Sequence, residues 1–570
     1  MNNLKIWLNQ MLTEGYKSYD AEVGLLTREV DYRKSGYHSK IFGTVHDINK
    51  SAVFAETAML SEEPVYKAAA KKILEVLTWQ QDLEPDSPTR GLWSYFYEQP
   101  ISEMLAPDWN WANFIGKRLV TVLALCSHQL EHELKEKMEI AVREAAWCSI
   151  RRNAKPGYTN ISLMSSFLEI AAGEVLGDTE IFEMGKMRLK EFMEFTTANT
   201  GFQEYNSSCY TPVAMLEISR MLAVFKDEEC LRMAKELNEF AWDNLASHYN
   251  INIMQLTAPQ ARSYTNVETD ENIGHSSVRA LIYIGTGGKY GKVAGIWELL
   301  YEMLSVPVIC PEKCLDKFAF KEDSFLAHAF FKTGNGRKIY PNEYDMTAYS
   351  YMTKKYSIGC MSGGDMWVQR RYLMAVWGKE KPCYIRLRAI HNDYDFCSGI
   401  EASCQYKNKI LTHIGFCRDR GSFHISLDKN KSGIYEAYEL LFKMELGGYT
   451  EEAWITQEGS RFWVRDRGIT VCIDVSAWKY DGKNAQFRLN KEAKAIEFVC
   501  FANEPQTFDL NNLSDSYGVF TTTIDTKEEI QVPEVVSVVS GDYIESYLKE
   551  MPEIRVKSPR IPKLFQETFV

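Results

Sequence analysis

A dense set of polar and phenolic side chains precedes a predicted helix near the middle of the chain. Its members are Glu204, Tyr205, Asn206 and Tyr210. Loops that only connect helices favour glycine, serine and small polar residues. Two tyrosines, an acid and an amide therefore indicate an edge that faces a ligand. The alternative is that the tyrosines pack and that the acid and the amide cap the helix.

The helix that follows this set is predicted from a capping signal and a periodic pattern. Thr211 and Pro212 indicate its start, because a hydroxyl can cap the first turn and proline lacks only an N–H that this turn leaves unused. Apolar residues then recur at helical spacing, at Met215, Ile218, Leu222 and Phe225. The polar set is therefore expected at the mouth of a helix.

Similar polar junctions recur along the first half of the chain. This half reads as amphipathic helices over about 51–80, 111–150, 161–197, 212–246 and 275–305. The junctions lie at 46–49, 110–113, 158–160, 204–206 and 264–266, and each unit has about the length of two helices with their loops. If such helical hairpins close into a ring, residues of the junctions, including Asn110, Trp111, Asn160 and Tyr264, line one cavity. The alternative is that asparagine before a helix is only a good cap.

From about residue 340 the spacing of the apolar residues changes from that of helices to that of strands. Strands are predicted over 366–377, 384–390, 495–501 and 517–524, and 461–475 reads as a β-hairpin turning at 466–468. Residues 530–570, which hold four prolines, are expected to form a tail over the surface. The predicted fold class is therefore α+β, with an (α/α) toroid of helical hairpins over 1–335 and an antiparallel β-sandwich domain over 336–570.

Composition excludes several classes of protein. The 570 residues carry a formal charge of −12 without a basic run, which argues against a general nucleic-acid binder. No stretch approaches the roughly 20 apolar residues that cross a membrane. The first ten residues read as an amphipathic helix and not as a signal peptide, and 13 cysteines lack Cys-x-x-Cys pairs, so reduced thiols and a cytoplasmic location are expected. Assembly into a homo-oligomer is left open.

The spacing Gly201-x-x-Glu204-x-x-Ser207-x-x-Tyr210 resembles the segment that carries the catalytic tyrosine in toroid-type polysaccharide lyases and their heparinase II/III-like relatives. Helical hairpins followed by a β-domain match the build of the same families. Two departures stand out. Asn110-Trp-Ala-Asn113 replaces the usual Asn-His pair, and Phe202 and Thr211 stand where some relatives have histidines.

The resemblance implies β-elimination from a glycan that contains uronic acid, without a metal or other cofactor. Tyr210 would act as base and acid, and Asn110 or Asn113, with Asn206 as a rival, would neutralise the carboxylate. A histidine would assist, often one from the β-domain in this fold type; His391 is preferred and His275 is the second candidate. The residues expected to bind the oligosaccharide are Glu204, Tyr205, Asn206, Arg262, Tyr264, His275, Arg370, Arg371, Trp111 and Asn160.

Three points stay open on the sequence alone. Asn110, Asn113 and Lys117 share one helical face, which could line the site or be an ordinary solvated face. Consecutive arginines on a strand point to opposite sides, so at most one of Arg370 and Arg371 is expected at the site. A glycoside hydrolase with paired carboxylates and a non-catalytic carbohydrate-binding protein are the alternative functions.

Overall fold

The computed structural model describes residues 2–31, 38–269, 277–295, 301–319, 322–327, 331–333, 344–365, 368–423, 428 and 430–568. These residues form two compact units. The helical unit comprises Met1–Ala198, Pro212–Trp242 and Ala280–Glu312, and the β unit comprises Asn199–Thr211, Asp243–Arg279 and Lys313–Val570. The domain boundary expected near 335 lies outside the described residues and stays a prediction.

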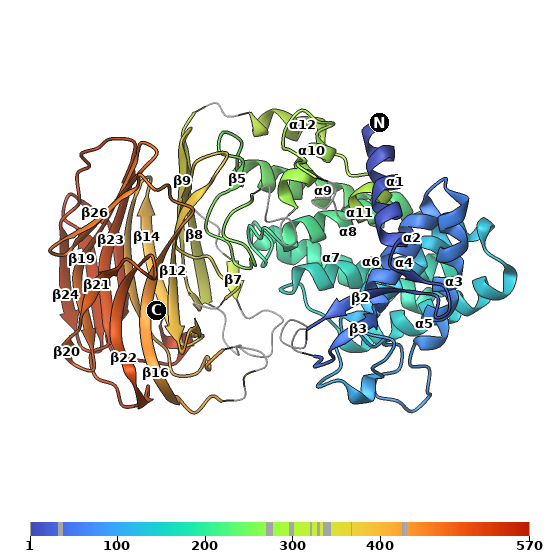
Figure 1. Cartoon of the computed structure of the whole chain (residues 1–570), viewed down its shortest axis with the longest axis horizontal. Coiled ribbons are helices and arrows are strands. Elements are labelled where there is room, and N and C mark those ends of the chain that lie inside the picture. Colours follow the sequence, from blue (N-terminus) through green and yellow to red (C-terminus); the bar gives the residue numbers. More distant parts are fainter. Residues whose placement is uncertain are drawn as a thin grey trace. The chain divides into compact units, whose positions relative to one another are not determined.

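The helical unit is built from consecutive helical hairpins (Figure 1). The hairpin helices are α2 (Ile48–Leu60), α3 (Pro64–Gln80), α4 (Trp111–Cys126), α5 (His132–Arg152), α6 (Thr159–Leu176), α7 (Thr179–Ala198), α8 (Tyr210–Val224) and α9 (Glu228–His248). Further helices are α1 (Asn2–Tyr16), α10 (Val278–Gly285), α11 (Tyr301–Ser305) and α12 (Glu312–Leu315), and a small sheet joins β1 (Tyr19–Asp20), β2 (Leu25–Val30) and β3 (Gly43–His46). Four predicted helical stretches thus resolve into the expected pairs.

The hairpins stack in two layers. α2 packs against α4 and α4 against α6, whereas α3 packs against α5 and α5 against α7. Val213 of α8 continues the first layer by packing with Ile161 and Met164 of α6. Gly173 lets α6 and α7 approach closely, because a Cβ at this position would lie 2.5 Å from Cβ of Phe182. Such alternation of layers is the arrangement of an (α/α) toroid, as predicted.

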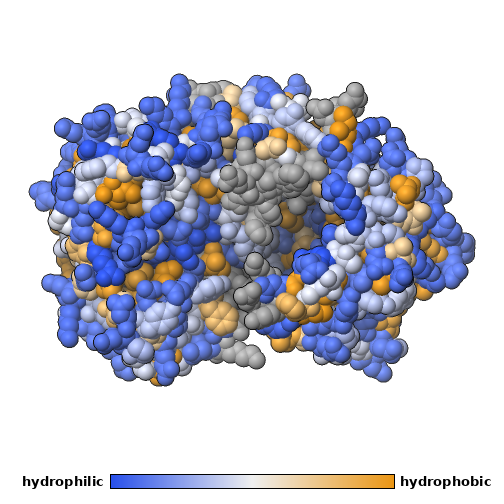
Figure 2. Space-filling model, in the orientation of Figure 1, coloured by the Kyte–Doolittle hydropathy of each residue, from blue (hydrophilic) through white to orange (hydrophobic). Residues whose placement is uncertain are grey.

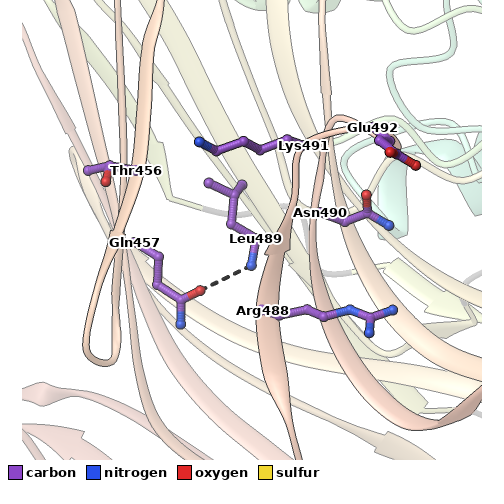
Figure 3. Close-up of a pocket in the computed structure, with 7 residues that line it drawn as sticks. All are labelled: Thr456, Gln457, Arg488, Leu489, Asn490, Lys491 and Glu492. Carbon is purple, nitrogen blue, oxygen red and sulfur yellow. Dashed lines mark hydrogen bonds between the residues drawn. The ribbon is translucent and has the colours of Figure 1, made fainter.

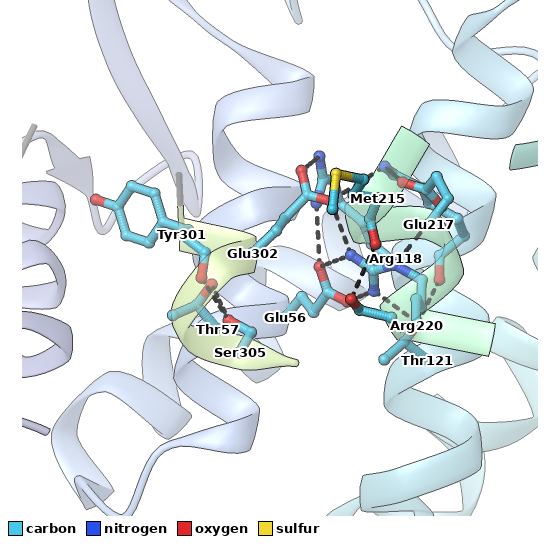
Figure 4. Close-up of polar contacts among 12 residues, drawn as sticks. Glu56, Thr57, Arg118, Thr121, Met215, Glu217, Arg220, Tyr301, Glu302 and Ser305 are labelled. Carbon is cyan, nitrogen blue, oxygen red and sulfur yellow. Dashed lines mark hydrogen bonds and ion pairs between the residues drawn. The ribbon is translucent and has the colours of Figure 1, made fainter. Parts of the chain in front are cut away.

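A buried group of three cations and three carboxylates joins three helices of the first layer to α11 (Figure 4). It consists of Glu56, Lys117, Arg118, Glu217, Arg220 and Glu302, which come from α2, α4, α8 and α11. Glu302 accepts from Lys117 at 3.1 Å, from Arg118 at 2.9 Å and from Arg220 at 2.9 Å. Burial alone would raise the pKa of Glu302, but these cations hold it well below its usual value. Three positive and three negative charges balance, so the network has no net formal charge.

The β unit contains two large antiparallel sheets (Figure 1). One sheet consists of β10 (Gly364–Asp365), β14 (Gly399–Tyr406), β15 (Lys409–Phe416), β23 (Tyr517–Asp525), β19 (Ile469–Tyr480), β18 (Arg461–Asp466), β17 (Trp454–Glu458) and β20 (Lys483–Asn484). The other consists of β21 (Phe487–Asn490), β22 (Ala495–Asp509), β16 (Ile434–Gly447), β12 (Cys383–His391), β11 (Met374–Trp377), β9 (Tyr356–Ser362), β8 (Tyr344–Met352), β6 (Ser324–Ala327), β13 (Tyr394–Asp395) and β7 (Phe331–Thr333). A two-stranded sheet joins β4 (Tyr249–Asn250) to β5 (Gln255–Leu256).

One apolar core is shared by the two large sheets. Leu387 and Phe442 of one sheet belong to the same buried cluster as Ile473 and Phe520 of the other. The predicted fold class, an (α/α) toroid of helical hairpins followed by an antiparallel β-sandwich, is therefore confirmed. The predicted hairpin at 461–475 also forms, since Asp466 pairs with Ile469 around two residues of positive φ.

Two local predictions were wrong. Of the strand expected over 366–377, only Met374–Trp377 is a strand; residues 366–367 lie outside the described residues, and 368–373 bridge to another loop at Arg371. The expected tail instead forms a third sheet of β24 (Val535–Ser540), β25 (Tyr543–Leu548) and β26 (Met551–Pro559). Its alternating apolar residues, such as Ile544, Ile554 and Val556, are buried in a core shared with β14, β15 and β23, and the prolines obscured that alternation.

No helix among the described residues is long and apolar enough to cross a membrane. Figure 2 shows hydrophilic residues over most of the visible surface, with apolar residues scattered among them. Scattered exposed apolar residues are normal for a folded protein.

Candidate functional site

Helix α8 begins earlier than its sequence predicts. The side-chain oxygen of Ser207 accepts a hydrogen bond of 2.9 Å from the backbone N–H of Tyr210, and the Ser207 carbonyl accepts one of 3.0 Å from Thr211. Ser207 is therefore the capping residue, and Thr211 is already inside the first turn. Tyr210 consequently lies in the first turn of the helix and not before it.

Three segments of the β unit join beside this helix start, and we call 204–210, 257–265 and 368–371 together the platform. Gln260 and Arg371 exchange two backbone hydrogen bonds of 2.9 Å. Ala261 donates to the carbonyl of Tyr205 at 3.0 Å, and Ser263 donates to the carbonyl of Gln369 at 2.5 Å. The backbone thus fixes side chains that are distant in sequence next to one another.

Arg262 is the centre of the polar side chains on the platform. Its Nη2 donates to the hydroxyl of Tyr210 at 3.1 Å, and its Nε donates to Oε1 of Gln369 at 3.1 Å. Its Nη1 pairs with the carboxylate of Glu204, which is buried. Gln369 in turn donates to the hydroxyl of Tyr264, which lies 3.2 Å from that of Tyr210. One guanidinium is therefore held by a carboxylate and an amide while it contacts a phenol.

The direction of these hydrogen bonds determines what Tyr210 can do. Because the Tyr264 oxygen accepts from Gln369, its own proton can be donated to Tyr210. The Tyr210 oxygen then accepts from both Tyr264 and Arg262, and its proton is left for a ligand. The Tyr210 side chain is half-buried, whereas Tyr264 is 46% exposed, so this edge of the platform meets solvent. Burial raises the pKa of Tyr210, and the positive charge of Arg262 opposes that rise.

Two further predicted residues of the platform are committed to its own structure. Asn206 has a positive φ of 46°, and its amide donates to the carbonyls of Thr257 at 2.6 Å and Pro259 at 3.0 Å. Tyr205 is buried, and its hydroxyl lies 2.6 Å from Nε2 of His248. Both side chains therefore hold the loop from inside.

The asparagines predicted to neutralise a carboxylate lie in the helical unit. Asn110 precedes α4, is half-buried, and donates from Nδ2 to the hydroxyl of Tyr158 at 3.3 Å. Asn113 is fully buried and donates to Ser165 at 3.2 Å. Lys117 belongs to the buried ion network, so this face of α4 is not a solvated face. Partial exposure leaves Asn110 as the more accessible amide.

Trp111 and Asn160, the remaining predicted site residues of the helical unit, lie at the starts of α4 and α6. The ring of Trp111 lies 4.2 Å from that of Tyr95, between centroids, and Asn160 is buried in the first turn of α6. The junction at 264–266 does not begin a helix, which corrects the expected fifth repeat. Tyr264 lies on the platform instead, and Asn266 accepts a hydrogen bond from Arg386 at 3.0 Å.

The histidine and arginine predictions differ in their surroundings. His391 ends β12, its Nε2 lies 3.2 Å from the carbonyl of Glu436, and its ring packs against Phe396, Tyr435 and Phe508. Burial lowers the pKa of His391. His275 lies outside the described residues. Arg371 is 2% exposed and Arg370 is half-buried, so Arg370 is the more accessible of the two.

Sequence reasoning missed Gln369 and the capping role of Ser207. Gln369 bonds partners 107 and 105 residues away, and no local pattern marks it. Ser207 carries an N-cap signal that the Thr211-Pro212 dipeptide obscured.

A hollow of about 580 Å³ lies elsewhere in the β unit, between β17 and β21 (Figure 3). It is lined by Thr456, Gln457, Arg488, Leu489, Asn490, Lys491 and Glu492. Across it, Gln457 accepts a hydrogen bond of 3.1 Å from the backbone N–H of Leu489. It contains none of the predicted site residues.

Comparison with known proteins gives a family match and structural similarities. Residues 9–291 match a family model described as a domain of unknown function (DUF8769). No curated protein matches the sequence. The structure is similar to heparinase III, with 8% identity, a TM-score of 0.40, and coverage of 90% of this chain and 84% of the other.

Two chondroitin lyases are similar to the same degree. For a chondroitinase AC lyase the identity is 10%, the TM-score 0.39, and the coverage 97% of this chain and 87% of the other. For the chondroitin AC lyase of Streptomyces coelicolor A3 the identity is 9%, the TM-score 0.35, and the coverage 92% of this chain and 96% of the other. These similar structures are polysaccharide lyases. At such identities and TM-scores, no residue role is transferred from them.

Proposed function

We propose that this chain is a lyase that cleaves a uronic-acid-containing glycan by β-elimination, with Tyr210 as the proton-transferring residue. The observation that supports this most strongly is the contact of Arg262 with the Tyr210 hydroxyl at a solvent-facing edge of the platform. A phenol is a poor base at its ordinary pKa near 10, so it needs a nearby cation to stabilise its ionised form.

The proposed reaction moves one proton and breaks one bond. The Tyr210 phenolate removes the proton from C5 of the uronate, and the C4–O bond breaks as a C4=C5 double bond forms. Tyr210 then donates this proton to the departing glycosidic oxygen, so no proton is consumed overall. Arg262 stabilises the phenolate, while Glu204 and Gln369 hold the guanidinium in position.

Neutralisation of the substrate carboxylate needs a hydrogen-bond donor for the charge that develops on it. We assign this role to Asn110 before Asn113, because Asn110 is half-buried and Asn113 is fully buried. Asn206 is a weaker candidate, since its amide donates to two carbonyls of its own loop. Arg370, Tyr264, Trp111, Asn160, His391 and His275 stay proposed contributors to binding or catalysis.

The test is an activity screen of uronate-containing oligosaccharides, read by the near-ultraviolet absorbance of the unsaturated product. Tyr210→Phe should lower the rate by about 100- to 10,000-fold, because it removes the proton-transferring oxygen with little change in shape. Tyr205→Phe is the control, since it removes a phenol oxygen from the same loop at a buried position. Saturated products lost in Glu204→Gln but retained in Tyr210→Phe would instead identify a hydrolase.

A further inference from the structure

Two buried arginines of the β unit converge on one carbonyl group. Arg371 of the platform and Arg386 of β12 are 2% and 4% exposed. Nη1 of Arg371 and Nη2 of Arg386, the latter at 3.4 Å, both donate to the carbonyl oxygen of Val368. Their guanidinium groups are therefore close neighbours inside the protein.

The charges around these arginines do not balance. Arg388 takes both oxygens of Asp395, at 3.0 and 2.6 Å, and Glu445 at 2.8 Å. Arg386 reaches Asp395 only at 3.5 Å, and Arg371 meets no carboxylate in the part of the chain that the structure describes. Three guanidinium groups thus share two carboxylates, which leaves one positive charge in excess. The ion network of the helical unit, by contrast, has equal numbers of both signs.

These two arginines also have hydrogen-bond donors without an acceptor among the described residues. The Nε atoms of Arg371 and Arg386 are both buried, and neither meets an acceptor among the described residues. Buried donors and buried charges without partners are costly. Burial, and then the neighbouring guanidinium of Arg386, hold the pKa of Arg371 well below its usual value. Arginine nevertheless keeps its proton in proteins, so relief must come from a negative partner.

We propose that Arg371 and Arg386 form a binding site for one small inorganic monoanion of the chloride type, which accepts from their Nε–H groups. One negative charge matches the excess of one positive charge. The burial of Arg371 favours a small ion over the carboxylate of a sugar, which is too large to reach it without rearrangement. The site is independent of the proposed lyase activity.

The position of the site couples it to the platform. Arg371 exchanges backbone hydrogen bonds with Gln260, and Val368 is followed directly by Gln369, whose side chain holds Arg262 and Tyr264. A bound anion would therefore stabilise the segment that carries Gln369.

Thermal unfolding of the purified protein tests the proposal. Sodium chloride or bromide is compared with sodium gluconate at equal ionic strength, so that only a specific effect of the small anion remains. The midpoint should rise by several degrees with halide and then saturate. Arg371→Met should lose this response and, in gluconate, be at least as stable as the wild type, because the excess charge is gone. Arg555→Met, at an exposed ion pair with Glu545, is the control and should keep the response.

Crystals soaked in bromide give an independent measurement that does not depend on a folded variant. An anomalous peak within hydrogen-bonding distance of both Nε atoms is expected. No peak there, or an equal halide response in wild type and Arg371→Met, would overturn the proposal. Stabilisation by glucuronate but not by halide, lost in Arg371→Met, would also overturn it and would assign the arginine to the acid group of a sugar.

Discussion

The guanidinium of Arg262 lies over the ring of Tyr210, with its Cζ 4.2 Å from the ring centroid, while its Nη2 donates to the phenol oxygen at 3.1 Å. Burial raises the pKa of this phenol, and the cation is the largest opposing influence. Burial keeps the pKa of Tyr210 raised, and Arg262 is the neighbour that favours its ionised form.

Replacing Arg262 should move the pH dependence of the proposed reaction. In Arg262→Met the pKa of Tyr210 rises further, so less phenolate forms at any given pH. The rate near neutral pH should fall by about 100-fold, and its increase with pH should level off at a higher pH. A pH profile of kcat/KM measures both effects. The double variant Tyr210→Phe/Arg262→Met should be no slower than Tyr210→Phe; additive losses would show that Arg262 acts elsewhere.

Asn206 should stabilise the platform through its amide and its backbone conformation. Asn206→Ala removes two buried hydrogen bonds and keeps a Cβ at positive φ, so the free energy of unfolding should fall by about 2–4 kcal/mol. Asn206→Gly loses the same bonds but tolerates that φ, and it should cost about 1 kcal/mol less. Urea denaturation compares them. Equal losses of unfolding free energy in the two variants would mean that the positive φ of residue 206 does not add to the cost of the alanine.

The ion network of the helical unit should be sensitive to the removal of one partner and tolerant of the removal of a pair. Lys117→Met leaves the fully buried Glu217 without its closest cation and should cost about 3–5 kcal/mol. Lys117→Met/Glu217→Gln should recover much of that loss in urea denaturation. Lys137→Met, which breaks an exposed pair with Glu133, is the control and should cost less than about 1 kcal/mol. A double variant as unstable as the single variant would contradict this.

Glu401 should make stability fall with rising pH. It is fully buried on β14, Ser403 donates to it at 2.8 Å, and burial raises its pKa from 4.5 to about 8. The pKa of Glu401 is higher in the folded state than in the unfolded state. Its contribution to the free energy of unfolding is therefore complete below about pH 4.5 and is lost as the pH rises toward 8.

The variant Glu401→Gln lacks this titration. Between about pH 5.5 and pH 8, the wild type should lose on the order of 3 kcal/mol more unfolding free energy than the variant. Chemical denaturation at the two pH values measures the difference. Parallel pH dependences in the two proteins would show that Glu401 does not titrate in this range.

The sequence determined the order and type of the elements wherever the signal is local. The apolar period of about 3.6 marked the helices that became α2 to α9, and alternation with a turn at Arg467-Gly468 marked the hairpin of β18 and β19. Tyr210, Glu204 and Arg262 were also singled out by residue type, and the structure brings these three together. Such features depend on neighbours within a few residues, which a single sequence displays.

Only the tertiary structure decided which side chains meet. Gln369 contacts Arg262 across 107 residues, and Lys117 faces Glu217 across 100 residues and not solvent. Helical spacing places Lys117 on a face of α4, but it does not say what packs on that face. Alternation on a strand likewise could not show that Arg371 would be buried beside Arg386, with no carboxylate of its own among the described residues. Pairing of charges depends on packing between distant elements, and the periodicity of one element carries no information about it.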